Sequence, residues 1–407
     1  MQTDKEIKRI HSNGKSHILL QITIYLLFGL GPLTGNVILV LFGVLSSEFG
    51  VSATSVTIAI SSFMFPFAII QLFSGAISDI RGRIPVILFG LIIFGVGMAI
   101  AIFSTSLVIY SIANVLGGIG FGFVNPVLIA LMTDISKRTD IPKKMGFLGA
   151  VANLGVGLGP ILAGQLATIG WQFLYIIFII VIVLGFIILL TLRKSNEKQL
   201  NNTQFRVFLN QINLELKRPV VILLILSAIL ATQSYLAVIT WTSRALNTPS
   251  IPANVAGGII GLAGIFGAIS GIIIGFLIKK VGVHIAILTS MVSLMISLFI
   301  FMNIKDITNI ETLPLVSMGF IFIGVAGGTI IPVIMFYSQT LSIERRGALA
   351  GLATAGQFIG IALGPITYGY FYDQGGITLV YLIILGVSLT FIIETIALYF
   401  VANKKKM

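Results

Sequence analysis

Long apolar segments alternate with short polar breaks from one end of the chain to the other. The segment from Ile176 to Leu192 shows the pattern most plainly, because every residue in it except Gly185 and Thr191 is aliphatic or aromatic. A helix of this composition has no polar face to turn toward water, so it is expected in lipid. Since a spanning helix needs about 20 predominantly apolar residues, the pattern predicts an all-α integral membrane protein with twelve spans. They lie at residues 18–42, 52–77, 84–104, 106–131, 146–167, 171–192, 219–243, 254–278, 284–303, 313–338, 348–371 and 378–401.

The distribution of charge predicts how these helices are oriented. Hydrophobic residues make up 57% of the chain and charged residues 9%, and all but two of the 25 Lys and Arg residues fall on one side when the breaks are assigned alternately. The two exceptions are Arg244 and Lys305. The positive-inside rule predicts that both termini are cytoplasmic, and we expect the protein to lie in the cell membrane. This topology and anionic lipid headgroups explain the net charge of +12, so no nucleic-acid partner is expected.

Two further features of composition limit the chemistry. The first apolar segment is too long for the core of a signal peptide, so we expect it to remain as a membrane anchor. The chain has no cysteine, which excludes disulfides and thiolate metal sites, and its three histidines do not cluster. We therefore expect no metal and no cofactor.

The longest polar break divides the chain into two parts of six helices each. It covers residues 193–218 and is followed by Pro219, which suits the first turn of a helix. We therefore expect an N-terminal half at 1–192, a cytoplasmic linker at 193–218 and a C-terminal half at 219–407. The halves also resemble each other, since GVGLGPILAG at 155–164 matches GIALGPITYG at 360–369 in six of ten positions. Many transporters place a substrate site between such repeats and alternate access to it.

The break after the second predicted helix holds a motif of glycines and charges. It contains Gly75, Asp79, Arg81, Gly82 and Arg83. A glycine in a tight turn can adopt a positive φ, and a neighbouring Asp and Arg can form an ion pair that breaks and forms again. The motif resembles the signature loop of the major facilitator superfamily, although its first basic position is shifted and its last is not basic. The resemblance implies that these residues gate the cytoplasmic side, and an ordinary basic loop is the alternative.

The fifth predicted helix carries small residues and a proline at regular spacing. Gly155, Gly159, Pro160 and Gly164 resemble the antiporter motif of superfamily exporters, which include the 12-helix drug/proton antiporters. The counterparts in the eleventh predicted helix are Gly360, Gly364 and Pro365. Because small residues let two helices approach closely, we expect a helix interface here, with Gly159 at a contact between the halves. A packing seam without a role in transport is the alternative.

The fourth predicted helix departs from the drug/proton antiporter pattern. It has Asn114 where that pattern has an arginine associated with proton coupling, although the glycines that follow match. Whether transport is coupled to protons therefore stays open. Asp134 and Arg346 resemble further gating positions of the family, and solvated helix ends are the alternative.

Polar side chains within apolar helices usually face the interior of a bundle. In superfamily members the first, fourth, seventh and tenth helices line the central cavity, and this implies a substrate-binding role for six residues. They are Asn36, Asn114, Asn125, Gln233, Tyr235 and Tyr337. For each of them, a hydrogen bond between helices is an equal alternative. Glu394 is the only carboxylate predicted well inside an apolar span, and it is either a proton-binding residue or a structural hydrogen-bonding group.

These observations predict a secondary active transporter and not an enzyme. The lack of Lys and Arg at membrane depth disfavours acidic substrates, and the motif in the fifth helix favours export of small apolar or amphipathic compounds by alternating access. Two alternatives stay open: uptake of a neutral solute such as a sugar or nucleoside, and a membrane enzyme or receptor without transport. The expected partners are a small-molecule substrate, membrane lipids and, as a candidate coupling ion, the proton. The family resemblance implies a monomer.

Overall fold

The computed structural model describes residues 14–137, 139–192, 210, 212–341 and 346–404, so most of the predicted linker lies outside the described residues. Within this part of the chain the regular elements are helices. They are α2 (Gly14–Phe49), α3 (Ala53–Val56), α4 (Ile58–Arg81), α5 (Arg83–Ile102), α6 (Leu107–Ile135), α7 (Ile141–Leu166), α8 (Gln172–Leu192), α10 (Pro219–Leu246), α11 (Ala253–Val281), α12 (Val283–Asn303), the short 3₁₀ helix η1 (Ile310–Thr312), α13 (Leu313–Thr340) and α14 (Arg346–Lys404).

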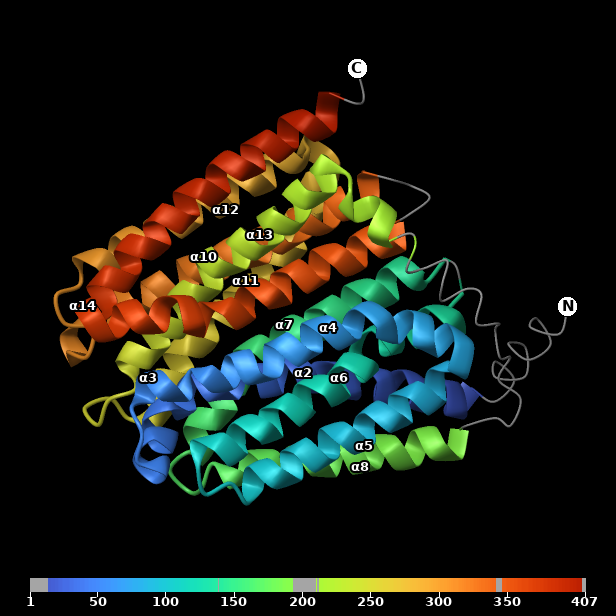
Figure 1. Ribbon diagram of the computed structural model, residues 1–407, viewed down its shortest axis with the longest axis horizontal. Coiled ribbons are helices and arrows are strands. Elements are labelled where there is room, and N and C mark those ends of the chain that lie inside the picture. Colours follow the sequence, from blue (N-terminus) through green and yellow to red (C-terminus); the bar gives the residue numbers. More distant parts are fainter. Residues whose placement is uncertain (1–13, 138, 193–209, 211, 342–345, 405–407) are drawn as a thin grey trace, which may run out of the picture.

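The described chain contains eleven helical stretches that are long and apolar enough to cross a membrane. The last helix, α14, has 59 residues, and a straight helix of that length would measure about 90 Å, roughly three times the thickness of the hydrocarbon core. Instead, Gly375 and Gly376 leave helical geometry, with φ values of −142° and 63°. Figure 1 shows α14 folding back on itself between its orange and red parts. Because α14 contains the two spans predicted at 348–371 and 378–401, the prediction of twelve spans is confirmed.

Two of the tight turns are built on glycine. Gly82 separates α4 from α5 with a φ of 91°, and Gly282 separates α11 from α12 with a φ of 107°. Residues with a Cβ rarely adopt these angles. Each glycine lets the chain reverse within a single residue between two spanning helices.

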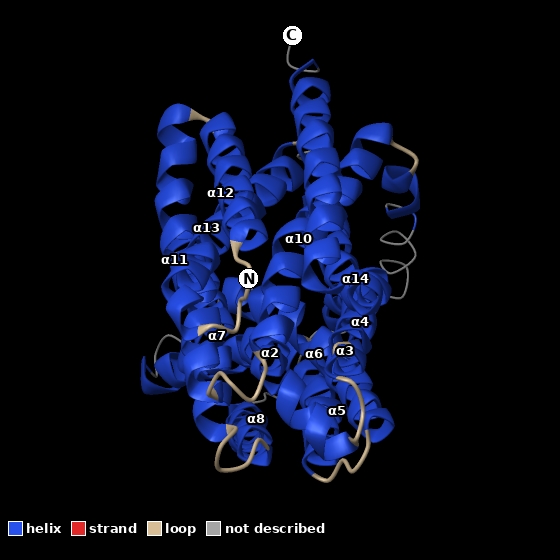
Figure 2. Ribbon diagram, turned by 90° about the vertical axis from the view of Figure 1, so that its left-hand side faces the viewer, coloured by secondary structure: helices blue, strands red, loops and turns tan. Residues whose placement is uncertain are grey.

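The helices form two sets that pack side by side. Helices α2–α8 make the first set and α10–α14 the second, and Figure 2 shows most of the second set above the first. The sets meet chiefly where α7 lies against α11 and where α4 lies against α14. Successive spans reverse direction, so α2 begins and α14 ends on the same side of the bundle (Figure 1). We call this the termini side, and the other end the opposite side.

Candidate functional site

A cavity of about 750 Å³ lies between the two sets. Its walls come from α2, α4, α6 and α7 in the first set and from α10, α11, α13 and α14 in the second. None of the described residues that line it is charged. Aromatic rings are prominent in the wall: Phe28, Phe63, Phe67, Phe121, Tyr235, Phe276 and Phe358. The size and lining suit an apolar small molecule.

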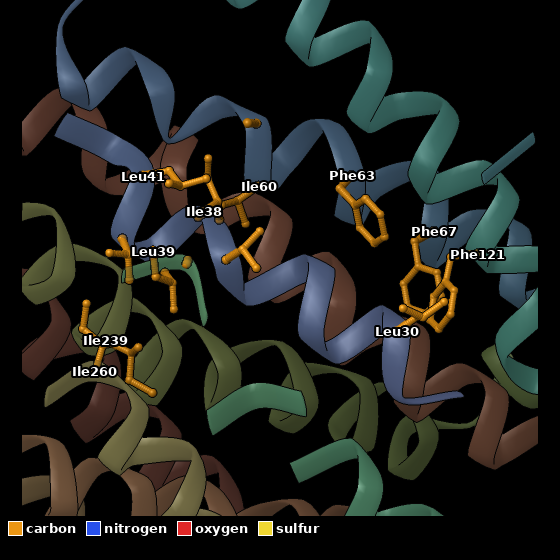
Figure 3. Packing of buried hydrophobic residues seen from close by; sticks show 14 of the residues in the cluster. Leu30, Ile38, Leu39, Leu41, Ile60, Phe63, Phe67, Phe121, Ile239 and Ile260 are labelled. Carbon is orange, nitrogen blue, oxygen red and sulfur yellow. The ribbon is translucent and has the colours of Figure 1, made fainter. Parts of the chain in front are cut away.

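Three of these rings form a cluster that bridges the sets. Phe67 of α4 stacks on Phe121 of α6 with ring centroids 5.6 Å apart, and it meets Phe358 of α14 edge-on at 4.5 Å. Figure 3 shows Phe63 on the same helix as Phe67, with Phe121 beside Phe67. Phe63, Phe67 and Phe358 were not among the residues predicted from the sequence to bind substrate. Phe63 and Phe67 are four residues apart, which places them on one face of a helix. This spacing could have indicated that their rings lie side by side.

A few neutral polar groups interrupt the apolar lining. They are Asn36, Asn125, Asn153, Thr232, Tyr235, Thr240 and Gln357. Asn36 donates from Nδ2 to the Pro32 carbonyl at 2.6 Å. The amide nitrogen of Gln357 is buried and has no hydrogen-bond partner in the described part of the chain. Groups of this kind can orient an amphipathic ligand without attracting a charge.

Direct contacts between the sets close the cavity on the opposite side. Ser61 Oγ in α4 donates to the Ala362 carbonyl in α14 at 2.6 Å. Just beyond the end of α10, Asn247 Nδ2 donates to the Leu39 carbonyl of α2 at 2.9 Å. Figure 3 shows Leu39 on the side of α2 that faces Ile239 of α10. A ligand could leave toward this side only if these contacts separated.

The cavity reaches the termini side. Its lining continues to Gly146 near the start of α7, Gly275 near the end of α11 and Met335 near the end of α13. A Cβ placed on Gly146 or Gly275 would meet no atom of the described residues within 4 Å. Phe276 lines the cavity and is also 72% exposed. The structure thus shows a cavity that is closed on the opposite side and open on the termini side.

Helices α7 and α11 make the tightest contact between the sets. A Cβ on Gly264 would overlap the backbone of Gly157, and one on Gly261 would lie 2.9 Å from the Gly157 carbonyl oxygen. One turn further toward the opposite side, Gly257 lies against the carbonyl of Pro160. The two backbones can approach this closely only because these positions lack side chains.

The motif glycines of α7 face two different partners. Gly155 and Gly159 pack on α2 of the same set, and a Cβ on Gly159 would lie 2.8 Å from the Leu33 carbonyl oxygen. The prediction that Gly159 lies at a contact between the halves is therefore wrong. Gly157, two residues from each, points about 200° away around the helix and meets α11 instead. Gly164 also faces the second set, where it lies against α11.

The counterpart in α14 packs on α10. Gly360 lies against Thr232, and its carbonyl accepts a hydrogen bond from Gln233 Nε2 at 2.8 Å. Gly364 is buried but a Cβ there would meet no atom within 4 Å. Pro365 follows it within the helix.

Arg83 is the centre of an ionic cluster on the termini side. Its guanidinium pairs with Asp79 at 2.5 Å and with Asp134 at 3.0 Å, and it donates to Ser78 Oγ at 2.6 Å. The cluster joins the ends of α4, α5 and α6 within the first set. Arg81 is exposed and forms no ion pair within the described chain.

The other predicted gating residues occupy different positions. Gly82 forms the turn between α4 and α5. A Cβ on Gly75 would meet no atom within 4 Å. Arg346 is the first residue of α14, and its side chain lies outside the described part of the structure.

Three of the six predicted substrate-binding residues line the cavity, namely Asn36, Asn125 and Tyr235. The other three do not. Asn114 donates to the Tyr110 carbonyl at 2.8 Å, and Gln233 donates to Gly360. Tyr337 is buried in an apolar cluster to which all five spanning helices of the second set, α10–α14, contribute.

Glu394 lies outside the cavity. Its carboxylate accepts a hydrogen bond from Ser227 of α10, and its second oxygen is buried without a partner among the described residues. The neighbouring α14 residues Phe391 and Leu398 belong to the same apolar cluster as Tyr337. The described residues contain no group of three His, Asp or Glu side chains that could hold a metal ion.

Comparison with known proteins places the chain in a family. The sequence profile described as Major Facilitator Superfamily matches residues 24–342 and 251–407, which together cover nearly the whole chain. The chain belongs to this superfamily. It is therefore a membrane transporter and not an enzyme.

Similar proteins include named bacterial relatives and a solved structure. Quinolone resistance protein NorA of Staphylococcus aureus (strain COL) is 25% identical over 391 residues, which cover 92% of this chain and 94% of NorA. Multidrug resistance protein D of Escherichia coli (strain K12) is 26% identical over 170 residues, 42% of this chain and 43% of the relative. The crystal structure of a mutant of the nucleoside transporter NupG has a TM-score of 0.75 and 17% identity, and the match covers 94% of this chain and all of that one. This last likeness concerns the fold alone.

Proposed function

We propose that this transporter exports small apolar or amphipathic molecules through the cavity between its two helix sets. The observation that carries the proposal is the cavity wall, which combines aromatic rings and a few neutral polar groups with no charge among the described residues. Such a wall cannot compensate a sugar phosphate or a dicarboxylate for the water it loses. An amphipathic compound loses less and gains contact with the rings.

The relatives support export as the direction. The names of quinolone resistance protein NorA and of multidrug resistance protein D refer to resistance to quinolones and to multiple drugs. Removal of a compound from the cell is the way in which a transporter confers such resistance. The match to NorA runs through nearly the full length of both chains.

The proposed cycle alternates access between the two sides of a cell membrane. The positive-inside rule supports a cytoplasmic termini side, and the proposed state is therefore inward-open, taking up its substrate from the cytoplasm or the inner leaflet. Closure of the termini side and separation of α2 from α10 on the opposite side would then release the substrate outside. Asp79, Arg83 and Asp134 are proposed to bias this closure, and the transporter is proposed to act as a monomer.

Within the cavity, Asn36, Asn125 and Tyr235 are the proposed polar contacts to substrate. Glu394 is the proposed proton-binding group, because it is a carboxylate held inside the bundle with one oxygen unpaired among the described residues. Its position outside the cavity means that proton and substrate would not compete for the same space.

Transport into liposomes with an imposed pH gradient tests the proposal. The panel contains a quinolone, a neutral amphiphilic dye, a nucleoside and a dicarboxylate, and protein-free liposomes give the background. We expect protein-dependent movement of the quinolone and the dye, and none of the dicarboxylate. Phe67→Ala should slow transport of the quinolone and the dye more than Phe89→Ala, because Phe89 is 53% exposed and does not line the cavity. Selective movement of the nucleoside would instead favour the uptake alternative.

A further inference from the structure

A second, much smaller cavity adjoins the main one between α10 and α14. It measures about 10 Å³, which is on the order of the space that one buried water molecule occupies. Thr232, Leu236, Thr240 and Ile361 line both cavities, so the small one lies directly beside the large one. Its remaining walls include Trp241, and we call it the Trp241 niche.

A residue in the wall of the niche, Trp241, has a hydrogen-bond donor without a partner among the described residues. Trp241 is fully buried, and its indole Nε1 has no hydrogen-bond partner among the described residues. The ring is held in place, since it stacks on Tyr372 of α14 with centroids 5.2 Å apart. Arg244 in turn lies over the Tyr372 ring, 5.0 Å from its centroid. A buried indole N–H without a partner is unfavourable, and such groups usually bind a protein acceptor, a water or a ligand.

The niche also has an acceptor that the sequence sets free. Pro365 has no backbone N–H, so the carbonyl of Ile361, four residues earlier, lacks its usual helical partner. Both residues line the niche. Gly364 lies between them in sequence, and because it is buried with no atom within 4 Å of a Cβ, it keeps this space open. Trp241 and Ile361 thus both line one small opening, whose wall also includes Thr232 and Thr240.

We propose that the Trp241 niche is a hydrogen-bonding subsite for one neutral polar group of the substrate, such as a hydroxyl or a carbonyl. Trp241 Nε1 donates to the bound group and the Ile361 carbonyl accepts from it, and a single water fills the subsite when no substrate is present. The apolar body of the substrate then lies in the main cavity among the rings. This proposal rests on the proposed function and adds to it one recognition feature: the substrate presents one small uncharged polar group to the niche.

The two tryptophans of the chain make the subsite directly measurable. Trp171 lies between α7 and α8 and donates its indole N–H to Glu48 in α2, so it belongs to a different region. Trp171→Phe leaves Trp241 as the single fluorescent indole. The probes are 2-cyclohexylethanol and ethylcyclohexane, which share a carbon skeleton, differ in one hydroxyl and do not fluoresce. The purified protein in detergent is titrated with each compound.

We expect a saturable shift of Trp241 emission with the alcohol, at about fivefold to tenfold lower concentration than with the hydrocarbon, the gain of roughly one hydrogen bond. Gly364→Ala adds a methyl group to the niche and should remove this preference. Gly386→Ala is the matched control, because Gly386 is also in α14, has no atom within 4 Å of a Cβ and does not line the niche. If Trp171→Phe folds poorly, the same comparison of the two glycine variants is made in the chain with both tryptophans.

Equal response to the two compounds, no saturable shift with the alcohol, or retention of the preference in Gly364→Ala would each overturn the subsite. Because binding is measured without a membrane, these results leave export itself standing. Failure of transport in liposomes with a normal emission shift would instead contradict the proposed function and keep the subsite.

Discussion

On the opposite side, α7 and α11 touch backbone to backbone, whereas on the termini side glycines of the same two helices face open space. Gly157 and Gly264 leave no room for a Cβ between them. Gly146 and Gly275, about three turns further along each helix, have no atom of the described residues within 4 Å of a Cβ. One residue type therefore stands in two different packing environments along a single pair of helices.

The difference shows what each group of glycines does. At the tight end, the missing side chain is needed in the state that the structure shows. At the open end it is not, since a larger residue would fit without contact. Glycine at the open end is needed only if the termini side closes in another state and brings the two helices together there. The tight end then acts as the pivot of that movement.

The largest effect is expected when the tight end is filled. In Gly264→Ala the new methyl group must displace the backbone of Gly157, and overpacking of this kind costs about 1–3 kcal/mol. We expect a lower unfolding temperature in detergent and at least a tenfold loss of transport. Gly258→Ala, also in α11 but with no atom within 4 Å, is the control and should behave like the unaltered chain. Equal unfolding temperatures and transport rates in the two variants would show that this contact is not the pivot.

Filling the open end is expected to lower the transport rate without lowering the stability of the protein. Gly275→Leu adds a side chain where the structure has space, and replacing a helical glycine raises helix stability by up to about 1 kcal/mol. We expect an unchanged or slightly higher unfolding temperature and a transport rate lowered severalfold, because leucine blocks closure. The two quantities are measured on the same preparation. Normal transport in this variant would show that α7 and α11 do not approach each other at that end.

The sequence predicted the helices well because each span is a long apolar run that ends at a polar break. The turn at Gly82 was equally readable, since charged residues surround a glycine. The direction in which a side chain points was not readable. Asn114 and Asn125 are both amides in α6, yet one bonds to Tyr110 of its own helix and the other lines the cavity.

The physical reason is the solvent. A helix in lipid is apolar all round, so hydropathy does not mark the face that packs on a neighbour. For this reason the spacing of Gly155 and Gly159 predicted a close helix contact but could not say whether α2 or α11 makes it. The position of Phe358 at the contact between the two sets could not be predicted for the same reason, because phenylalanine also suits lipid-facing positions.

A smaller effect is expected from the ionic cluster on the termini side. Asp79 is about half exposed and pairs with Arg83 inside one set, so Asp79→Asn should change the stability of this state by less than about 1 kcal/mol. If Asp79 also holds the closed termini side, its loss shifts the population toward the open state. The chain has no cysteine, so Gly149→Cys in the cavity wall reports this opening by its labelling rate.

We expect labelling of this cysteine to rise about twofold to threefold in Asp79→Asn. Asp134→Asn is the comparison variant, because Asp134 binds the same arginine from α6 and is also a proposed gating residue. An unchanged rate in Asp79→Asn would show that the cluster only joins α4, α5 and α6. An equal rise in both variants would assign the effect to Arg83 and not to Asp79.

The smallest effect on the packing of the tight and open ends is expected from a change at Glu394, because this residue belongs to neither α7 nor α11. Glutamine has the same size and can keep the hydrogen bond to Ser227, so Glu394→Gln should preserve folding and the labelling rate of Gly149→Cys. It cannot bind and release a proton. If Glu394 couples transport to protons through α10, whose Thr232 and Tyr235 line the cavity, the variant should lose the stimulation by an imposed pH gradient. Exchange of substrate without a gradient should continue, because the cavity itself is intact. Full stimulation in Glu394→Gln would leave Glu394 as a structural link between α14 and α10. Transport would then be coupled to protons through another group, or would not be coupled to protons.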